Sequence, residues 1–337
     1  MKRAVLLLIL LISTGCAQPK RALLEPVGAP IVWPPAPDQP RVRYLGEIRG
    51  SQDFQPKKSF GQQLDEFFHG PAAPSPLVTP YAVAVHVDGL RVAVADTSAM
   101  CVHLMNLGTQ DYRRIWSCGT PPRPLESPVA VTWVGDDLII ADAKLHALGV
   151  IRADGREVWL AENLLQRPAG LAYSATNQLL YVSDAGAHAV IALELDGSLV
   201  TQIGAKGAGP GQFNCPAQLA AVGQELFVID ALNFRVQRLT LDGIPVGQFG
   251  RKGDAPGDLA LPKGVAVDAD GNLWVVDAHF ENVQAFLPDG TLLMAFGKEG
   301  HGPGEFWLPA GACVDARNRL WIADSYNRRV QVFELIR

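Results

Sequence analysis

The sequence is poor in charged residues, and those it has are scattered. Asp, Glu, Lys and Arg make up 19% of the chain, the formal net charge is −5, and there is no long run of like charges and no strongly basic segment. Proteins that bind nucleic acids neutralise phosphates with clustered Lys and Arg. The sequence therefore predicts no nucleic-acid partner.

The linear motifs of several chemistries are also missing. None of the five cysteines belongs to a Cys-x-x-Cys-His haem motif or to a paired Cys-x-x-Cys zinc motif, and there is no Gly-x-Ser-x-Gly nucleophile elbow. These absences argue against attached c-type haem, a zinc-ribbon site and an α/β-hydrolase active site. No cofactor is predicted from a motif.

The N-terminus lacks a hydrophobic run long enough to cross a bilayer. Residues 4–12 are apolar, but these nine residues fall short of the roughly 20 that a membrane-spanning helix needs. Lys2 and Arg3 precede them, and Cys16 follows soon after. A short apolar run behind positive residues is typical of a secretory signal peptide.

The end of this segment resembles the lipobox of bacterial lipoproteins, in which the cysteine is diacylated and becomes the first mature residue. Small residues precede Cys16, although Ser13 stands where Leu is usual. The resemblance implies removal of residues 1–15, a lipid anchor on Cys16 and a place in the bacterial cell envelope. Ala17 after the cysteine favours the outer over the inner membrane. The alternative is an ordinary secretory peptide cut near Ala17.

A proline-rich stretch follows. Residues 17–40 contain seven prolines, and such a composition favours extended polyproline conformation over a packed core. The sequence predicts that residues 16–40 form a tether between the membrane and the folded domain.

An internal repeat fills the rest of the chain. Each copy begins with a proline and small apolar residues, continues into a strand that ends in aspartate, and adds two more strands. Apolar residues alternate with a period of two, which excludes a helical solenoid. Four short strands in each 40–48 residues are typical of a propeller blade. The sequence predicts an all-β, six-bladed propeller of four-stranded antiparallel blades over residues 80–337. The starting prolines are Pro80, Pro128, Pro168, Pro216, Pro262 and Pro309.

Three loops between blades share one pattern, Gly-x-x-Gly-x-x-Pro-Gly-x-Phe/Leu, at residues 204–213, 250–259 and 297–306. With these loops, residues 80–337 resemble the NHL-repeat family, in which the loops are structural. The resemblance implies a six-bladed propeller, here in a lipoprotein member of the family. The glycines could also suggest a phosphate-binding loop, but such a loop is followed by a helix, and the sequence predicts no helix here.

The sixth blade lacks a fourth strand within the C-terminal sequence. Residues 42–50 resemble the fourth strand of the preceding blade at 292–300, and Phe54 falls where Phe306 would. We expect residues 42–49 to complete blade six and to close residues 41–337 into a monomeric ring without an exposed edge. A helical insertion is expected at residues 59–69, either covering one end of the propeller or acting as a lid or docking helix.

Two sets of residues are candidates for chemistry. The aspartates that end each second strand recur once per blade, so we interpret them as acceptors for backbone N–H groups. His146, His188 and His279 lie in loops on one face, where they could bind a divalent metal such as zinc or simply face solvent. Amidating lyases that resemble this family place histidines just after the blade-starting prolines. The residues here are Tyr81, Val129, Ala169, Ala217, Lys263 and Ala310.

Arg and Tyr side chains in the same loops are candidates for partner contacts, because these residue types dominate interface hot spots. They are Arg235, Tyr326, Arg328 and Arg329. Within the family loop pattern the arginine most often packs against neighbouring loops. Cys101 and Cys118 open a third strand and end a fourth, so a cross-strand disulfide between them is predicted for an oxidising compartment.

The sequence thus predicts a lipid-anchored envelope propeller that binds a protein or polymer partner without catalysis. The alternative is a metal-dependent propeller lyase or hydrolase that uses histidines near the central channel.

Overall fold

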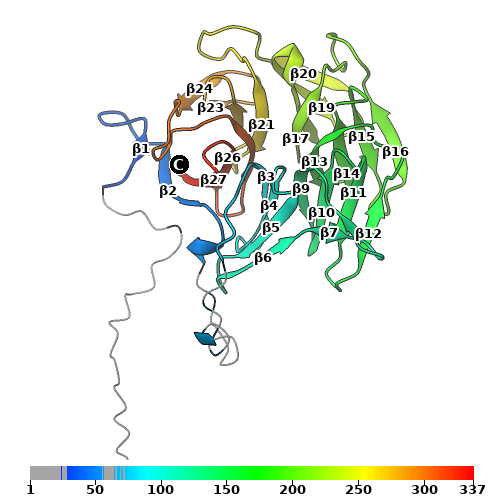
Figure 1. Cartoon of the computed structure of the whole chain (residues 1–337). Helices are drawn as coiled ribbons and strands as arrows, with labels where there is room; N and C mark the ends of the chain where they lie inside the picture. The colour runs from blue at the N-terminus through cyan, green and yellow to red at the C-terminus, as the bar shows by residue number, and fades with distance from the viewer. Residues whose placement is uncertain are drawn as a thin grey trace, which may run out of the picture.

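The computed structural model describes residues 24, 29–54, 56, 64, 67, 68, 70 and 73–337. Its strands form six antiparallel sheets arranged around a central axis, which confirms the predicted six-bladed β-propeller (Figure 1). Cys16, residues 1–15 and most of the predicted tether lie outside the described residues.

Each blade runs from an inner to an outer strand. Blade one contains β3 (Pro80–Val85), β4 (Arg91–Asp96), β5 (Cys101–Asn106) and β6 (Asp111–Ile115). Blade two contains β9 (Pro128–Val134), β10 (Asp137–Asp142), β11 (Ala147–Ile151) and β12 (Glu157–Leu160). Blade three contains β13 (Pro168–Ser174), β14 (Leu179–Asp184), β15 (Ala189–Leu193) and β16 (Leu199–Ile203). Blade four contains β17 (Pro216–Val222), β18 (Glu225–Asp230), β19 (Arg235–Thr240) and β20 (Pro245–Phe249). Blade five contains β21 (Pro262–Val267), β22 (Leu273–Asp277), β23 (Asn282–Phe286) and β24 (Leu292–Phe296).

Blade six has five strands in the order β1-β2-β27-β26-β25, with β25 (Pro309–Val314) innermost. The others are β26 (Arg319–Asp324), β27 (Arg329–Leu335), β2 (Val42–Ile48) and β1 (Val32–Trp33). A small hairpin of β7 (Ser117–Cys118) and β8 (Arg123–Pro124) and two 3-10 turns, η1 (Ser51–Asp53) and η2 (Ala231–Asn233), complete the described elements.

The inner strands are rich in Gly and Ala because neighbouring blades almost touch at the axis. A Cβ added to Gly264 would lie 2.4 Å from the carbonyl oxygen of Ala310, closer than real side chains approach. The loops between blades are equally tight. Phe213, Leu259 and Phe306 at their ends are fully buried, so they fill the gaps between blades.

The N-terminal strand closes the ring. β2 pairs antiparallel with β27, with Val42 opposite Leu335 and Ile48 opposite Val330, as expected from the sequence. Figure 1 shows the blue β2 beside the C-terminal β27. Phe54 is 5% exposed and packs in the core between blades six and one, where the sequence placed it.

The predicted tether becomes structured earlier than expected. β1 lies within residues 16–40 but pairs with β2, and the ring of Trp33 packs 5.3 Å from that of Phe296. The apolar Trp33 side chain gains more by packing between Phe296 of blade five and Phe333 of blade six than by staying extended in solvent. Any free tether therefore ends before β1.

The predicted helical insertion at 59–69 lies mostly outside the described residues. Leu64, Phe67 and Phe68 are described with helical backbone, and their side chains are exposed. No helix among the described parts of the chain is both long and apolar enough to cross a membrane.

The predicted disulfide between Cys101 and Cys118 is wrong, since both are free thiols. Cys101 lies in β5, whose partner β6 already ends at Ile115, opposite Val102. The chain then leaves blade one, and Cys118 packs in blade two, where its Sγ lies 3.6 Å from the carbonyl oxygen of Val150. The sequence argument failed because it extended the fourth strand three residues too far.

Candidate functional site

One face of the ring carries the N-terminal ends of the inner strands and the loops between second and third strands; we call it the proline face. The six aspartates lie just beneath it, and each is fully buried. Asp184 illustrates their role, because its carboxylate accepts four backbone N–H bonds from the loops around it. The aspartates hold loops together, as the sequence indicated, and do not form a site.

The fourth residue after each aspartate has a left-handed backbone and lies on the proline face. These residues are Met100, His146, His188, Phe234, Glu281 and Arg328, with φ between 51° and 57°. A left-handed position ends the tight turn into the third strand, so the backbone requirement repeats while the side chain is free to vary. At these six positions, sequence differences between blades reach the surface of the proline face.

The three predicted histidines make separate contacts. His146 is exposed and hydrogen bonds through Nδ1 to the carbonyl oxygen of Gln166. His188 is half-buried, and its Nδ1 accepts the backbone N–H of Cys215 at 3.1 Å. His279 is exposed beside the ring of Phe280. Within the described part of the chain, no group of three or more His, Cys, Asp or Glu side chains could hold a metal ion.

Two residues predicted to contact a partner are instead buried and hold blades together, which corrects their assignment to a binding face. The Arg235 and Arg329 side chains are 6% and 1% exposed. Each guanidinium donates to the aspartate of its own blade, Asp230 or Asp324, and to carbonyl oxygens of the preceding inter-blade loop. The fork of an arginine can satisfy several acceptors at once, which suits it to joining blades.

Tyr326 and Arg328 are exposed on the proline face as predicted. Tyr326 is 54% exposed and its ring lies 5.6 Å from that of Trp307, which is itself 41% exposed. His301 extends the group, with its ring 5.3 Å from Trp307. Exposed aromatic side chains in a cluster are common where proteins bind partners, because they bury large area at low entropic cost.

A recess opens on the axis of the ring. Its walls are the first residues after the blade-starting prolines, and most of them are small. Gln218 closes it from below: the side chain crosses from blade four, donates to the carbonyl oxygen of Ala312 at 2.6 Å and accepts the backbone N–H of Ala312 at 3.0 Å. The axial recess therefore has a polar floor and a volume of about 20 Å³, which is enough for one small polar group.

Lys263 and Tyr81 are the two large side chains in this wall. The Lys263 Nζ lies 5.9 Å from the centre of the Tyr81 ring, and among the described residues no carboxylate forms an ion pair with it. Burial lowers the pKa of Lys263, and Glu281 only partly offsets this. A partly desolvated ammonium without a counter-ion is ready to pair with an anionic group.

Arg167 adds a second cation near the recess. It is exposed and donates from Nη2 towards the Sγ of Cys215 at 3.8 Å. Burial raises the pKa of Tyr81, and the positive charge of Arg167 opposes that rise. The positive charges of Lys263, in the wall of the recess, and of Arg167, outside it, favour a carboxylate or phosphate near this part of the proline face. The sequence reasoning missed this set because it tested these positions only for histidine.

Comparisons with known proteins agree with the fold. The NHL repeat family matches residues 306–333. No curated protein sequence matches the chain. Among solved structures, virginiamycin B lyase from Staphylococcus aureus is similar, with 15% identity, 77% of this chain and 96% of that chain covered, and a TM-score of 0.55.

Two structures from Bacteroides thetaiotaomicron are also similar. A protein of unknown function has 17% identity, with 88% of this chain and 76% of that chain covered and a TM-score of 0.62. An auxiliary nutrient binding protein has 12% identity, with 76% and 68% covered and a TM-score of 0.60. At these identities the likeness concerns the fold alone. Six closed blades identify the chain as a six-bladed β-propeller, and the last of them contains a stretch that matches the NHL repeat.

Proposed function

We propose that this protein is a non-enzymatic binding scaffold that holds an acidic group of a protein or polymer partner on its proline face. The observation that carries the proposal is Lys263, half-buried at the mouth of the axial recess without a carboxylate partner among the described residues. Arg167 and Tyr81 complete a set of donors there, and the aromatic cluster around Tyr326 and Trp307 widens the contact surface.

Site-specific photocrosslinking in the native envelope tests this. A photoreactive residue at Tyr326 should crosslink one defined partner, identified by mass spectrometry. The same residue at Asp154, in an exposed turn between β11 and β12, is the control. Lys263→Gln should reduce the crosslink from position 326 about tenfold, since charge-assisted hydrogen bonds contribute roughly 1.5–3 kcal/mol. Equal crosslinking from positions 326 and 154, or no effect of Lys263→Gln, would refute the proposal.

The place of action is proposed to be the bacterial cell envelope, with the outer membrane favoured. The lipobox-like sequence ending in Cys16 supports this, as does the folded domain that begins at β1, within the proline-rich stretch. Cys16→Ser should move the protein from the membrane fraction to the soluble fraction without changing its melting curve. Retention of Cys16→Ser in the outer-membrane fraction would contradict a lipid anchor at this position.

A metal-dependent lyase or hydrolase is the other function considered. Virginiamycin B lyase shares the fold, but His146 and His188 make separate contacts here. Stoichiometric metal in the purified protein, lost in a His146→Ala/His188→Ala double variant, would favour the enzyme over the scaffold.

A further inference from the structure

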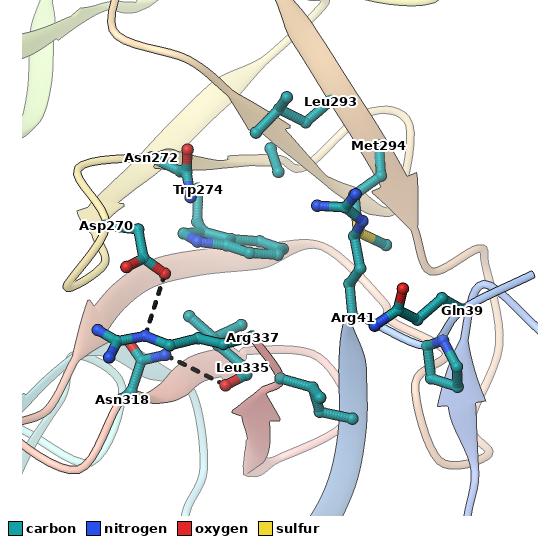
Figure 2. A pocket seen from close by; sticks show the side chains of 13 residues that line it. Gln39, Arg41, Asp270, Asn272, Trp274, Leu293, Met294, Asn318, Leu335 and Arg337 are labelled. Carbon is teal, nitrogen blue, oxygen red and sulfur yellow. Dashed lines mark hydrogen bonds and ion pairs between the residues drawn. The ribbon is translucent and has the colours of Figure 1, made fainter.

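A second recess lies away from the proline face, where the two ends of the described domain meet. It has a volume of about 320 Å³, and we call it the closure recess. Arg41 lies just before β2, Leu335 ends β27, and blade five contributes Trp274 and Met294. Figure 2 shows these side chains around one opening. Pockets of this size accommodate small organic ligands.

The floor of the closure recess is apolar and rigid. Trp274 is 4% exposed, and its Nε1 already donates to Asp268 at 2.9 Å, so the indole offers carbon atoms to the recess. Leu335 and Ala285 are also buried, and Met294 is half-buried. An apolar body of a ligand would displace water from this surface without leaving a protein polar group unpaired.

The rim is positively charged. Arg337 pairs with Asp270 at 3.2 Å, whereas no described carboxylate forms an ion pair with Arg41, whose exposed side chain extends across the opening in Figure 2. An adjoining recess is lined by Arg43, paired with Glu334, and by Arg317. Four arginine and two acidic side chains line the two recesses, which gives an excess of positively charged side chains beside an apolar floor.

We propose that the closure recess binds a small organic acid. The apolar body lies on Trp274 and Met294, and the carboxylate pairs with the guanidinium of Arg41. Arginine recognises a carboxylate through two parallel N–H bonds, a geometry that a neutral amide cannot match. This site is separate from Lys263 and does not depend on the function proposed for the proline face.

Binding there also clamps the ring. Arg41 precedes the closing strand, and its carbonyl oxygen accepts the backbone N–H of Ile336 at 2.8 Å. Residue 41 comes just before β2, and residue 335 is the last residue of β27. A ligand that touches both residues therefore contacts the two strands whose pairing closes blade six. Because it binds only the closed ring, it stabilises the folded state by mass action.

Calorimetry and thermal unfolding of the full chain test the proposal with indole-3-carboxylate and hexanoate as probes. At least one should bind, and at ten times its dissociation constant it should raise the melting temperature by about 3 °C. Arg41→Gln should weaken that binding about tenfold or more, while its melting temperature without probe stays unchanged. Indole-3-carboxamide, which is neutral, should bind at least tenfold more weakly than indole-3-carboxylate.

Two variants locate the probe. Arg156→Gln removes a guanidinium that is 78% exposed on blade two and should leave binding unchanged. Lys263→Gln should also leave it unchanged. Hydrogen exchange with the probe bound should slow in residues 41–48 and 330–336. Failure of both probes to bind, binding that survives Arg41→Gln, or binding that is lost in Lys263→Gln would overturn the proposal.

Discussion

The ion pair between Glu47 and Arg329 ties the closing strand to blade six, and its removal gives the sharpest test of how the ring is held. Arg329 is 1% exposed, and its Nη1 donates to the Oε2 of Glu47 at 2.7 Å. Arg49 also donates to Glu47, at 2.6 Å. Glu47→Gln keeps the shape of the side chain but removes the charge that faces a buried guanidinium.

We expect Glu47→Gln to lower the free energy of unfolding by about 2–3 kcal/mol at pH 7. Hydrogen bonds between charged groups contribute roughly 1.5–3 kcal/mol, and breaking a fully buried ion pair costs about 3–5 kcal/mol. The lower end of that span applies because Glu47 is 26% exposed and Arg329 retains Asp324. Urea denaturation followed by circular dichroism measures the change. Glu334→Gln is the control, because its exposed pair with Arg43 should contribute less than about 1 kcal/mol.

The pH dependence gives an independent check. Burial alone would raise the pKa of Glu47, but the hydrogen bonds from Arg49 and Arg329 outweigh it and hold that pKa below its ordinary value of 4.5. A carboxyl with a lowered folded-state pKa stabilises the protein above its unfolded pKa and loses that effect as pH falls through the folded one. The stability difference between wild type and Glu47→Gln should therefore be full above pH 4.5 and shrink below it. A loss equal to that of Glu334→Gln, or a difference that does not change with pH, would refute this account of closure.

Three further predictions concern the core of the ring. Gly264→Ala should destabilise the protein by about 1–3 kcal/mol because its Cβ would meet a backbone oxygen at 2.4 Å, whereas Gly247→Ala, with nothing within 4 Å, should be neutral in the same urea assay. Asp184→Asn should lower the free energy of unfolding by about 2 kcal/mol, since a carboxylate that accepts four backbone N–H bonds becomes a neutral amide. A decrease of less than about 0.5 kcal/mol would count against its role as a loop anchor. Burial raises the pKa of the Cys101 thiol to about 12 and that of Cys118 to about 11, so neither should react with maleimide at pH 8 until the protein is unfolded.

The fold could be predicted because the starting proline and the aspartate recur in all six blades and the glycine-rich loop recurs three times. A proline, an aspartate and a glycine-rich loop at matched positions fix where a blade starts, turns and meets its neighbour. The closing strand was visible for the same reason, since residues 42–50 fill the one gap in the pattern. Cys101 and Cys118 show the limit of this reasoning. No repeat specifies where β6 ends, so the register beyond Ile115 could not be read from the sequence.

The candidate sites were harder to predict because they depend on contacts between positions that no spacing connects. The closure recess joins Arg41, Trp274 and Leu335, which meet only because β2 pairs with β27 to close blade six beside blade five. Two arginines show the opposite error, in which residues predicted to contact a partner have a structural role. Arg235 and Arg329 have the residue type of an interface hot spot, but burial against Asp230 and Asp324 makes them structural.

Residues that differ from their equivalents in the other blades can be assigned to a functional or a structural role once their burial is known. His103 occupies a position that is glutamine in blades four to six, and it remains structural because it is fully buried and its Nε2 lies 3.2 Å from Asp96, as Gln237 does from Asp230. Lys263 departs in a different way from the Ala or Val that blades two, three, four and six carry at the same position. It is half-buried and lines the axial recess, and none of the described carboxylates forms an ion pair with it. Burial disfavours the charge of Lys263 and Glu281 offsets this only in part, so an acidic group of a partner would stabilise the ammonium further, which is why the partner is expected to be acidic.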